Sequence, residues 1–284
     1  MIGKTKKELG PCKNEKGGST MNINTKQNNK NNLTLKIIAA NLLFLSVFVS
    51  QAFGSGDQIL EKVDETMNAP KSSFSISQMI LVDSSGNRKE REMMEWSKKQ
   101  GNETIRLIKF VSPKDVKDVG FLTLAEDQMY LWLPEFGKVR RIASSAKNQN
   151  FMGSDLSYDD LSTTDRTKHY SAKIIAEDDK TWTLLLTRKP NSDKPYSKTE
   201  MVVSKESYVT LESKMYDESG NLWKTMKIKP KKVGKYWTIE ELIVEDKKTN
   251  HKTIIINKDT KFDIDLSDEI FTQRTLKKQA DQIK

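Results

Sequence analysis

The segment QMYLWLPEFGKVRRIASSAKNQNFMGSDLSYDDL, residues 128–161, decides the fold that the sequence predicts. Gln128–Leu133 is rich in β-prone residues, and Pro134–Gly137 has the composition of a tight turn. Lys138–Ile142 is then expected to pair back, and a polar segment around Gly153 follows. A chain built from such hairpins predicts an antiparallel sheet.

The rest of the chain repeats this pattern of short β-prone segments separated by turns. The further expected strands are Phe74–Val82, Arg88–Lys99, Thr104–Val111, Phe121–Ala125, Tyr170–Ala176, Thr181–Arg188, Lys198–Ser204, Val209–Tyr216, Leu222–Lys229, Tyr236–Glu245 and Lys252–Ile256. A sheet of about a dozen antiparallel strands has to curl or split. The sequence therefore predicts a mainly β fold, in which one strongly curved antiparallel sheet forms a half-open barrel.

A few short helices are expected beside the sheet. Asp57–Met67 has helical spacing of apolar residues, with Asp57 available as N-cap and Pro70 ending the helix. Ser157–Leu161 and Ser267–Phe271 each begin with a serine that is followed by acidic residues, which is typical of a capped helix start. We expect these helices to lie in the mouth of the barrel as a lid.

An incomplete barrel of this size is expected to enclose a cavity, because larger barrels are not filled by their own side chains. Methionine and tryptophan suit adaptable apolar surfaces, and they recur on the expected strands. The predicted lining residues are Met79, Met94, Trp96, Met129, Trp132, Met201, Met215, Trp223, Met226 and Trp237. Ordinary core packing is the competing interpretation for each residue alone, whereas the whole set favours a cavity for an apolar ligand.

Parts of the opening segment resemble the LolA-like family of periplasmic outer-membrane lipoprotein-sorting proteins. The matching residues are Trp132-Leu133-Pro134, the basic run Lys138, Arg140 and Arg141 with Ile142, and the signature loop Gly153-Ser154-Asp155-Leu156-Ser157-Tyr158-Asp159-Asp160-Leu161. The general resemblance extends from about Gln58 to Phe271. It implies a half-open barrel with a helical lid and the binding of acyl chains from a lipid or lipoprotein. It also implies an inner-membrane exporter of the resistance-nodulation-division type as a partner.

Residues 1–54 have the features of a leader with a cleavable signal peptide. The Lys- and Asn-rich start ends at Lys36, and Ile37–Val49 is an apolar run that is too short to span a bilayer. Small residues at Ala52 and Gly54 suit cleavage after Gly54. A buried core helix is the alternative, which the Lys-rich front and the small residues after the run disfavour.

Residues 55–284 are expected to form a single mature domain. The only cysteine, Cys12, lies before the apolar run, so no cysteine is placed to carry a lipid anchor, and Met21 is the expected translation start. Removal of eight Lys and two Glu with the leader lowers the net charge from +9 to +3 (9 − 8 + 2), which gives no argument for nucleic-acid binding. We expect a soluble, monomeric periplasmic protein.

The sequence shows no catalytic or metal-binding motif. His169 and His251 are the only histidines, and neither has a second ligand at metal-binding spacing. No G-x-S-x-G elbow and no Gly-rich phosphate loop occurs. We therefore expect no enzymatic activity, no cofactor and no metal.

The charged residues of the opening segment allow more than one interpretation. Asp159 and Asp160 could form a carboxylate pair or a calcium site with Asp155, but a local capping role is favoured because Ser157 and Asp160 have N-cap spacing. The basic run Lys138, Arg140 and Arg141 could meet a lipid headgroup or form ion pairs with these aspartates, and the ion pairs are favoured.

The sequence supports two functions. The first is a carrier that shields the acyl chain of a lipid or lipoprotein on its way toward the outer membrane. The alternative is a non-catalytic cell-envelope assembly or interaction module that works with an inner-membrane exporter.

Overall fold

The computed structural model describes residues 55–101, 103–162 and 165–283. The chain divides into two units, Met1–Phe48 and Val49–Lys284, and all the described residues belong to the second. The expected leader and its cleavage site lie outside the described residues. Every strand of the sheet belongs to the second unit.

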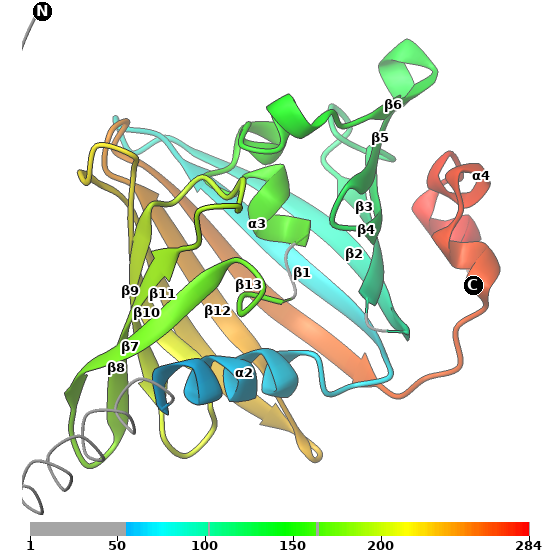
Figure 1. Ribbon diagram of the computed structural model, residues 1–284. Helices are drawn as coiled ribbons and strands as arrows, with labels where there is room; N and C mark the ends of the chain where they lie inside the picture. The colour runs from blue at the N-terminus through cyan, green and yellow to red at the C-terminus, as the bar shows by residue number, and fades with distance from the viewer. Residues whose placement is uncertain (1–54, 102, 163–164, 284) are drawn as a thin grey trace, which may run out of the picture. The chain divides into compact units, whose positions relative to one another are not determined.

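One sheet of thirteen antiparallel strands makes up most of the described residues (Figure 1). The strands are β1 (Ser72–Val82), β2 (Arg88–Gln100), β3 (Glu103–Ser112), β4 (Gly120–Ala125), β5 (Gln128–Leu133), β6 (Lys138–Arg141), β7 (Tyr170–Glu177), β8 (Thr181–Arg188), β9 (Lys198–Ser204), β10 (Thr210–Tyr216), β11 (Leu222–Val233), β12 (Tyr236–Asp246) and β13 (His251–Phe262). Their order is β6-β5-β4-β3-β2-β1-β13-β12-β11-β10-β9-β8-β7. The predicted mainly β fold is confirmed.

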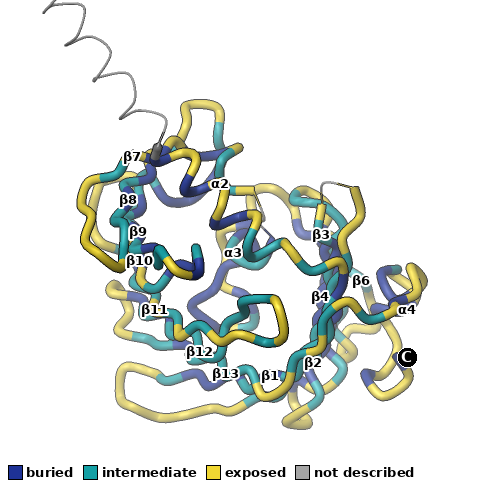
Figure 2. Tube along the Cα trace, turned by 90° about the horizontal axis from the view of Figure 1, so that it is seen from below, coloured by how far each residue is buried: buried dark blue, intermediate teal, exposed yellow. Residues whose placement is uncertain are grey.

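The sheet curls into a barrel that stays open between its two edges, β6 and β7. Figure 2 looks along the barrel, and the strands follow one another around a ring that opens between these edges. Between β6 and β7, residues 142–162 and 165–169 run across the opening, and we call them the crossing segment. It carries η2 (Ser144–Ala146), η3 (Phe151–Gly153) and α3 (Tyr158–Ser162). The predicted half-open barrel is therefore confirmed.

Helix α2 (Ser55–Met67) packs against β7, β8 and β9. Its Leu60 and Val63 are fully buried in a cluster with strand residues. Because the helix begins at Ser55, Asp57 lies in its first turn and is not the N-cap that the sequence predicts. Instead, Asp57 Oδ1 accepts a hydrogen bond of 2.6 Å from the Ala172 amide of β7. Within the described ranges, no helix is long and apolar enough to cross a membrane.

The C-terminal segment, residues 264–283, covers the outer face of β2 to β5. It contains η4 (Asp268–Phe271), α4 (Gln273–Leu276) and η5 (Ala280–Gln282). Ser267 caps η4 by accepting a hydrogen bond from the Glu269 amide, as predicted. However, η4 does not lie in the mouth as the sequence predicts, because Ile270, Phe271 and Leu276 pack against the outward-facing residues Trp96, Leu107 and Leu122.

Two strands continue at least four residues beyond their predicted ends. β13 continues beyond Ile256 to Phe262, because residues 257–262 pair with the first half of β1 although their own pattern is mostly polar. β11 continues through Pro230, where a register shift between Lys229 and Pro230 accommodates a residue that cannot donate a ladder hydrogen bond. Pairing with a neighbouring strand thus overrides local propensity in both places.

Candidate functional site

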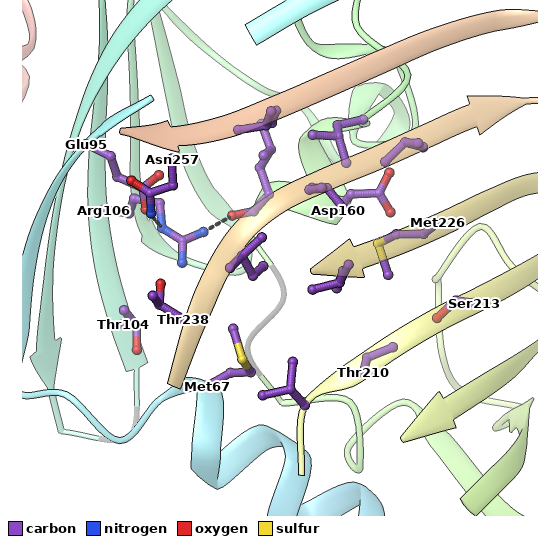
Figure 3. A pocket seen from close by; sticks show the side chains of 18 of the residues that line it. Met67, Glu95, Thr104, Arg106, Asp160, Thr210, Ser213, Met226, Thr238 and Asn257 are labelled. Carbon is purple, nitrogen blue, oxygen red and sulfur yellow. Dashed lines mark hydrogen bonds and ion pairs between the residues drawn. The ribbon is translucent and has the colours of Figure 1, made fainter. Parts of the chain in front are cut away.

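The inner face of the barrel and the segment across its opening enclose a cavity of about 420 Å³. Figure 3 shows part of its lining, which comes mainly from β1 to β3, from β7 to β13, from the end of α2, from residues 151–161 and from the loop residues Arg166, Lys194 and Tyr196. Its volume lies within the roughly 300–1,000 Å³ of small-molecule binding sites.

One side of the cavity is apolar and deformable. Methionine residues from β1, β2, β9, β10 and β11 line the cavity, and branched aliphatic side chains fill the spaces between them. The apolar lining includes Met79, Leu186, Met201, Met215, Met226, Ile228, Leu242, Val244 and Ile255. Unbranched methionine side chains adapt to ligands of different shape, so this surface suits a flexible hydrocarbon chain.

Another part of the lining carries a polar wall, which we define as Ser75, Ser77, Glu95, Arg106 and Asn257. These residues come from β1, β2, β3 and β13 and all line the cavity. Ser75 pairs with Glu95 across β1 and β2, and Ser77 pairs with Asn257 across β1 and β13. The cavity is therefore amphipathic rather than uniformly apolar.

Arg106 and Glu95 of the polar wall form an ion pair. Arg106 Nε lies 2.8 Å from Glu95 Oε1, and Arg106 Nη1 donates a hydrogen bond of 2.7 Å to the Leu161 carbonyl. Arg106 thus ties the inner face of β3 to the segment that crosses the opening. Within the described part of the chain, Asn257 Oδ1 is buried and has no hydrogen-bond partner.

The crossing segment is anchored by aromatic packing at Phe151, which is 1% exposed. Its ring centroid lies 5.8 Å from that of Phe110, 5.2 Å from that of Phe121 and 5.7 Å from that of Tyr158. Gly153 follows in the left-handed region at φ 73°, which glycine adopts without strain. Phe151 thereby packs the segment against residues of the barrel strands, and the polar residues Asp159 and Asp160 line the cavity.

Helix α3 is capped by a reciprocal pair. The Asp160 amide donates to Ser157 Oγ at 3.0 Å, and the Ser157 amide donates to Asp160 Oδ2 at 2.8 Å. The predicted capping role is confirmed. Asp160 also accepts a hydrogen bond of 3.0 Å from the Tyr196 hydroxyl, and burial raises the pKa of Tyr196 well above its usual value, with the Asp160 charge acting in the same direction.

Two buried lysines hold the aspartates of the crossing segment. Lys194 Nζ lies 2.8 Å from Asp159 Oδ1 and also contacts Glu126. Lys224 Nζ donates a hydrogen bond of 2.6 Å to the Asp155 carbonyl. Burial acts to raise the pKa of Glu126, but Lys194 and His169 outweigh it and hold the pKa at about 2.

Asp155 is fixed by the barrel wall. Its Oδ2 accepts a hydrogen bond from Thr253 Oγ1 at 2.6 Å and contacts His251 Nδ1 at 2.7 Å. The Asp155 amide donates to Thr253 Oγ1 at 2.8 Å. Both partner residues lie on β13, so this aspartate joins the crossing segment to the strand that pairs with β1.

Comparison with known proteins places this architecture in a family. A family model described as "Uncharacterized protein" matches residues 102–278. The chain belongs to that family. No curated protein matches the chain.

Solved structures share the fold of this family member. A DUF1329 family protein from Desulfovibrio piger has a TM-score of 0.74 at 25% identity, over 79% of this chain and 99% of that one. A domain named for outer-membrane lipoprotein sorting, from Vibrio parahaemolyticus, has a TM-score of 0.72 at 25% identity, over 78% and 98%. A LolA superfamily protein from Nitrosomonas europaea has a TM-score of 0.63 at 20% identity, over 78% and 98%. The predicted resemblance to the LolA-like group is confirmed.

Half of the residues predicted to line the cavity of this LolA-like barrel do so. They are Met79, Met201, Met215, Met226 and Trp237. The other five lie elsewhere, and three of these, Met94, Trp96 and Trp132, project from the outer face into the cluster under the C-terminal segment. Alternate residues of a strand face opposite sides, and in β2 it is Met93 and Glu95 that face the cavity.

Met129 and Trp223 complete this correction. Met129 is fully buried beneath the crossing segment, in the cluster that contains Phe151. The indole Nε1 of Trp223 donates to Asp246 Oδ2 at 3.0 Å, and its ring packs edge-on against Tyr196 at 5.6 Å. Methionine and tryptophan therefore serve packing at these two positions.

The LolA-like signature loop comes together, but without the predicted arginine partners. Gly153, Ser154, Asp155, Tyr158, Asp159 and Asp160 all lie in the crossing segment. Lys138, Arg140 and Arg141 belong to the edge strand β6 and are mostly exposed, and Arg141 donates to the Asp127 carbonyl at 3.2 Å. The predicted ion pairs are wrong, because Lys194 and Lys224 take the aspartates instead. Their contacts bridge distant parts of the chain, so local spacing could not reveal them.

Sequence reasoning also missed the polar wall, although a signal for it was present. In β1, serines occupy positions 73, 75 and 77 and alternate with Phe74 and Ile76. This alternation places the serines on one face of a strand, and that face lines the cavity. Among the described residues, no group of three or more His, Cys, Asp or Glu side chains is placed to hold a metal ion.

Proposed function

We propose that this chain is a periplasmic, soluble and monomeric carrier that takes the hydrocarbon chain of a lipid or lipoprotein into its cavity. The observation that carries the proposal is the cavity of about 420 Å³, whose apolar side is built from methionine and branched aliphatic residues. Burial of each CH₂ group contributes about 0.8 kcal/mol, so about ten such groups supply enough gross affinity for reversible binding. The mechanism needs no covalent step, cofactor or metal.

The crossing segment is the part that would admit the ligand. It connects the two edge strands β6 and β7, which do not pair with each other in the described sheet. Leu156 and Leu161 of this segment line the cavity, so displacement of the segment would widen the entrance without breaking the strand ladder. The similar fold of the Vibrio domain named for outer-membrane lipoprotein sorting supports the proposal that this chain is a carrier.

Tryptophan fluorescence provides a direct test, because Trp237 lines the cavity while Trp132 lies under the C-terminal segment. Titration with a long-chain phospholipid should change the emission of the wild-type protein. The change should disappear in Trp237→Phe and persist in Trp132→Phe. Native mass spectrometry of the protein purified from the periplasm should show a bound lipid. No emission change in any of the three proteins, with no lipid in the spectra, would contradict a carrier.

The β5–β6 hairpin favours the second candidate, an interaction module. Phe136 at its tip is 64% exposed, and Lys138, Arg140 and Arg141 follow it on β6. An exposed aromatic residue beside cations suits contact with a protein partner such as an inner-membrane exporter. If the chain is an interaction module and not a carrier, the wild-type protein should bind no lipid in vitro. Phe136→Ser should then abolish its function in cells. A wild-type protein that binds lipid in vitro contradicts this second candidate.

A further inference from the structure

We propose that the cavity selects amphiphiles with an uncharged, polyhydroxylated headgroup, which binds to the polar wall while the chain binds to the apolar side. This inference rests on the proposed function and specifies its ligand class. Figure 3 shows Glu95, Arg106 and Asn257 gathered on one side of the cavity, with Met226 on a different side. An apolar chain alone would leave the polar wall without ligand contacts, and an amphiphile would satisfy both sides.

The inner face of the sheet changes from polar to apolar in successive rows. Thr260, Ser75 and Glu95 stand side by side on β13, β1 and β2. Further along the same strands, Ile255 and Met79 are partners in the ladder. All five residues line the cavity, so a ligand lying along β1 would meet hydroxyl groups at one end and hydrocarbon at the other.

The balance of charge disfavours an anionic headgroup. The charged residues that line the cavity are the cations Arg106, Arg166, Lys194 and Lys224 and the acids Glu95, Asp159 and Asp160. Two further acids pair with these cations from behind the lining. Asp64 Oδ1 lies 2.5 Å from Arg166 Nη1, and Glu126 contacts Lys194. Five acids therefore face four cations around the described lining, and Arg106 already pairs with Glu95.

The hydrogen-bonding capacity of the wall specifies hydroxyl groups. Asn257 Oδ1 is a buried acceptor without a partner among the described residues, so it needs a donor. An ionised carboxylate or phosphate can only accept, whereas a sugar or glycerol hydroxyl both donates and accepts. Such a hydroxyl can donate to Asn257 Oδ1 or to Glu95 and accept from Ser75 or Ser77. A buried polar group without a partner is costly, so filling it favours the polyhydroxylated ligand.

Two buried hydroxyl groups lie among the apolar residues, because Ser213 pairs with Met201 and Met226 in the sheet. Ser213 and Thr210 of β10 line the cavity and are 3% and 4% exposed. Their hydroxyl oxygens have no hydrogen-bond partner in the part of the chain that the structure describes. Figure 3 shows both on the far side from Glu95, so they lie away from the polar wall and add no contact for a headgroup bound there.

The test compares ligands that share one chain length and differ only in their heads. The dissociation constants of n-decyl β-glucoside, decanoate and decyl phosphate are measured by calorimetry on the wild-type protein, below the micelle concentration of each. We expect the glucoside to bind about tenfold more tightly than either anion, which is the gain of one well-formed buried hydrogen bond. In Asn257→Leu, the glucoside should bind about tenfold more weakly than it binds to the wild type, and the affinity for decanoate should stay unchanged, so the preference should disappear.

Met226→Leu serves as the matched control, because it alters the apolar side and keeps the polar wall. It should change the affinities for all three ligands by the same factor and keep the tenfold preference. Equal or tighter binding of decanoate to the wild type would overturn the headgroup inference and leave the carrier proposal standing. So would a preference that survives in Asn257→Leu. If none of the three amphiphiles binds, the carrier proposal itself fails.

Discussion

Replacement of Lys194 by methionine should destabilise the domain by about 3–5 kcal/mol at pH 7. The ammonium group is 2% exposed and lies 2.8 Å from Asp159, which is itself buried, and it also contacts Glu126. Methionine keeps the apolar stem but leaves two carboxylates without this partner. Removal of one member of a buried pair costs this much because the remaining charge stays desolvated.

The contact between Lys194 and Glu126 predicts how the cost of Lys194→Met depends on pH. The folded-state pKa of Glu126 is about 2 and the ordinary value is 4.5, so its stabilising contribution is present above pH 4.5 and is lost as the pH falls through 2. The cost of the substitution should therefore shrink on acidification, because the carboxylates left behind become protonated. Urea denaturation at about pH 7 and at about pH 3.5 measures both quantities.

Lys62→Met is the control for this comparison. Lys62 Nζ lies 2.5 Å from Glu65 on the surface of α2, with both side chains more than half exposed. Methionine and lysine have similar helix propensities, so the control should cost no more than about 0.5 kcal/mol. A cost below about 1 kcal/mol for Lys194→Met, or a cost that is independent of pH, would refute the view that Lys194 holds the crossing segment.

Ser157→Ala should lower stability by about 1 kcal/mol in thermal denaturation, because the Asp160 amide loses its cap, and an unchanged midpoint would contradict this. Leu276→Ala should cost about 2–5 kcal/mol in urea denaturation, since Leu276 is fully buried against the outer face, while Leu222→Ala, at a 37% exposed position, should cost less than half as much. Burial lowers the pKa of Lys109 to about 8 from 10.5. Between these values only the unfolded chain binds the proton, so stability should rise with pH there, and Lys109→Met should remove this part of the rise.

Strands with strong local signals were predictable from the sequence. β5, β8 and β9 have the predicted bounds, because each combines β-prone residues with a turn at both ends. β13 was predicted too short because the polar residues 257–262 become a strand only through pairing with β1. The number of strands and the half-open barrel followed from the turns, which are local features of the chain.

The face that each residue takes was harder to predict. In β2, Met93 and Met94 are adjacent, so both faces of the strand contain methionine and the alternation does not say which one faces the cavity. The C-terminal segment determines which face is the outer one, because it covers Trp96 while Glu95 lines the cavity. The partner of Asp159 was not predictable from local spacing, because Lys194 lies 35 residues away along the chain.

The order of the strands also determines how the domain can assemble. Every pair of neighbouring strands in the sheet is also consecutive in the chain, apart from β1 and β13. The meander from β1 to β6 and the meander from β7 to β13 can therefore each set their register through hairpin turns, which is fast because the contacts are local. The β1–β13 ladder, from Ser73 with Phe262 to Val82 with Lys252, is the long-range step that joins the two meanders. Because Ser77, Asn257, Met79 and Ile255 lie along this ladder, the step that completes the sheet is also the step that brings the polar and apolar sides of the cavity together.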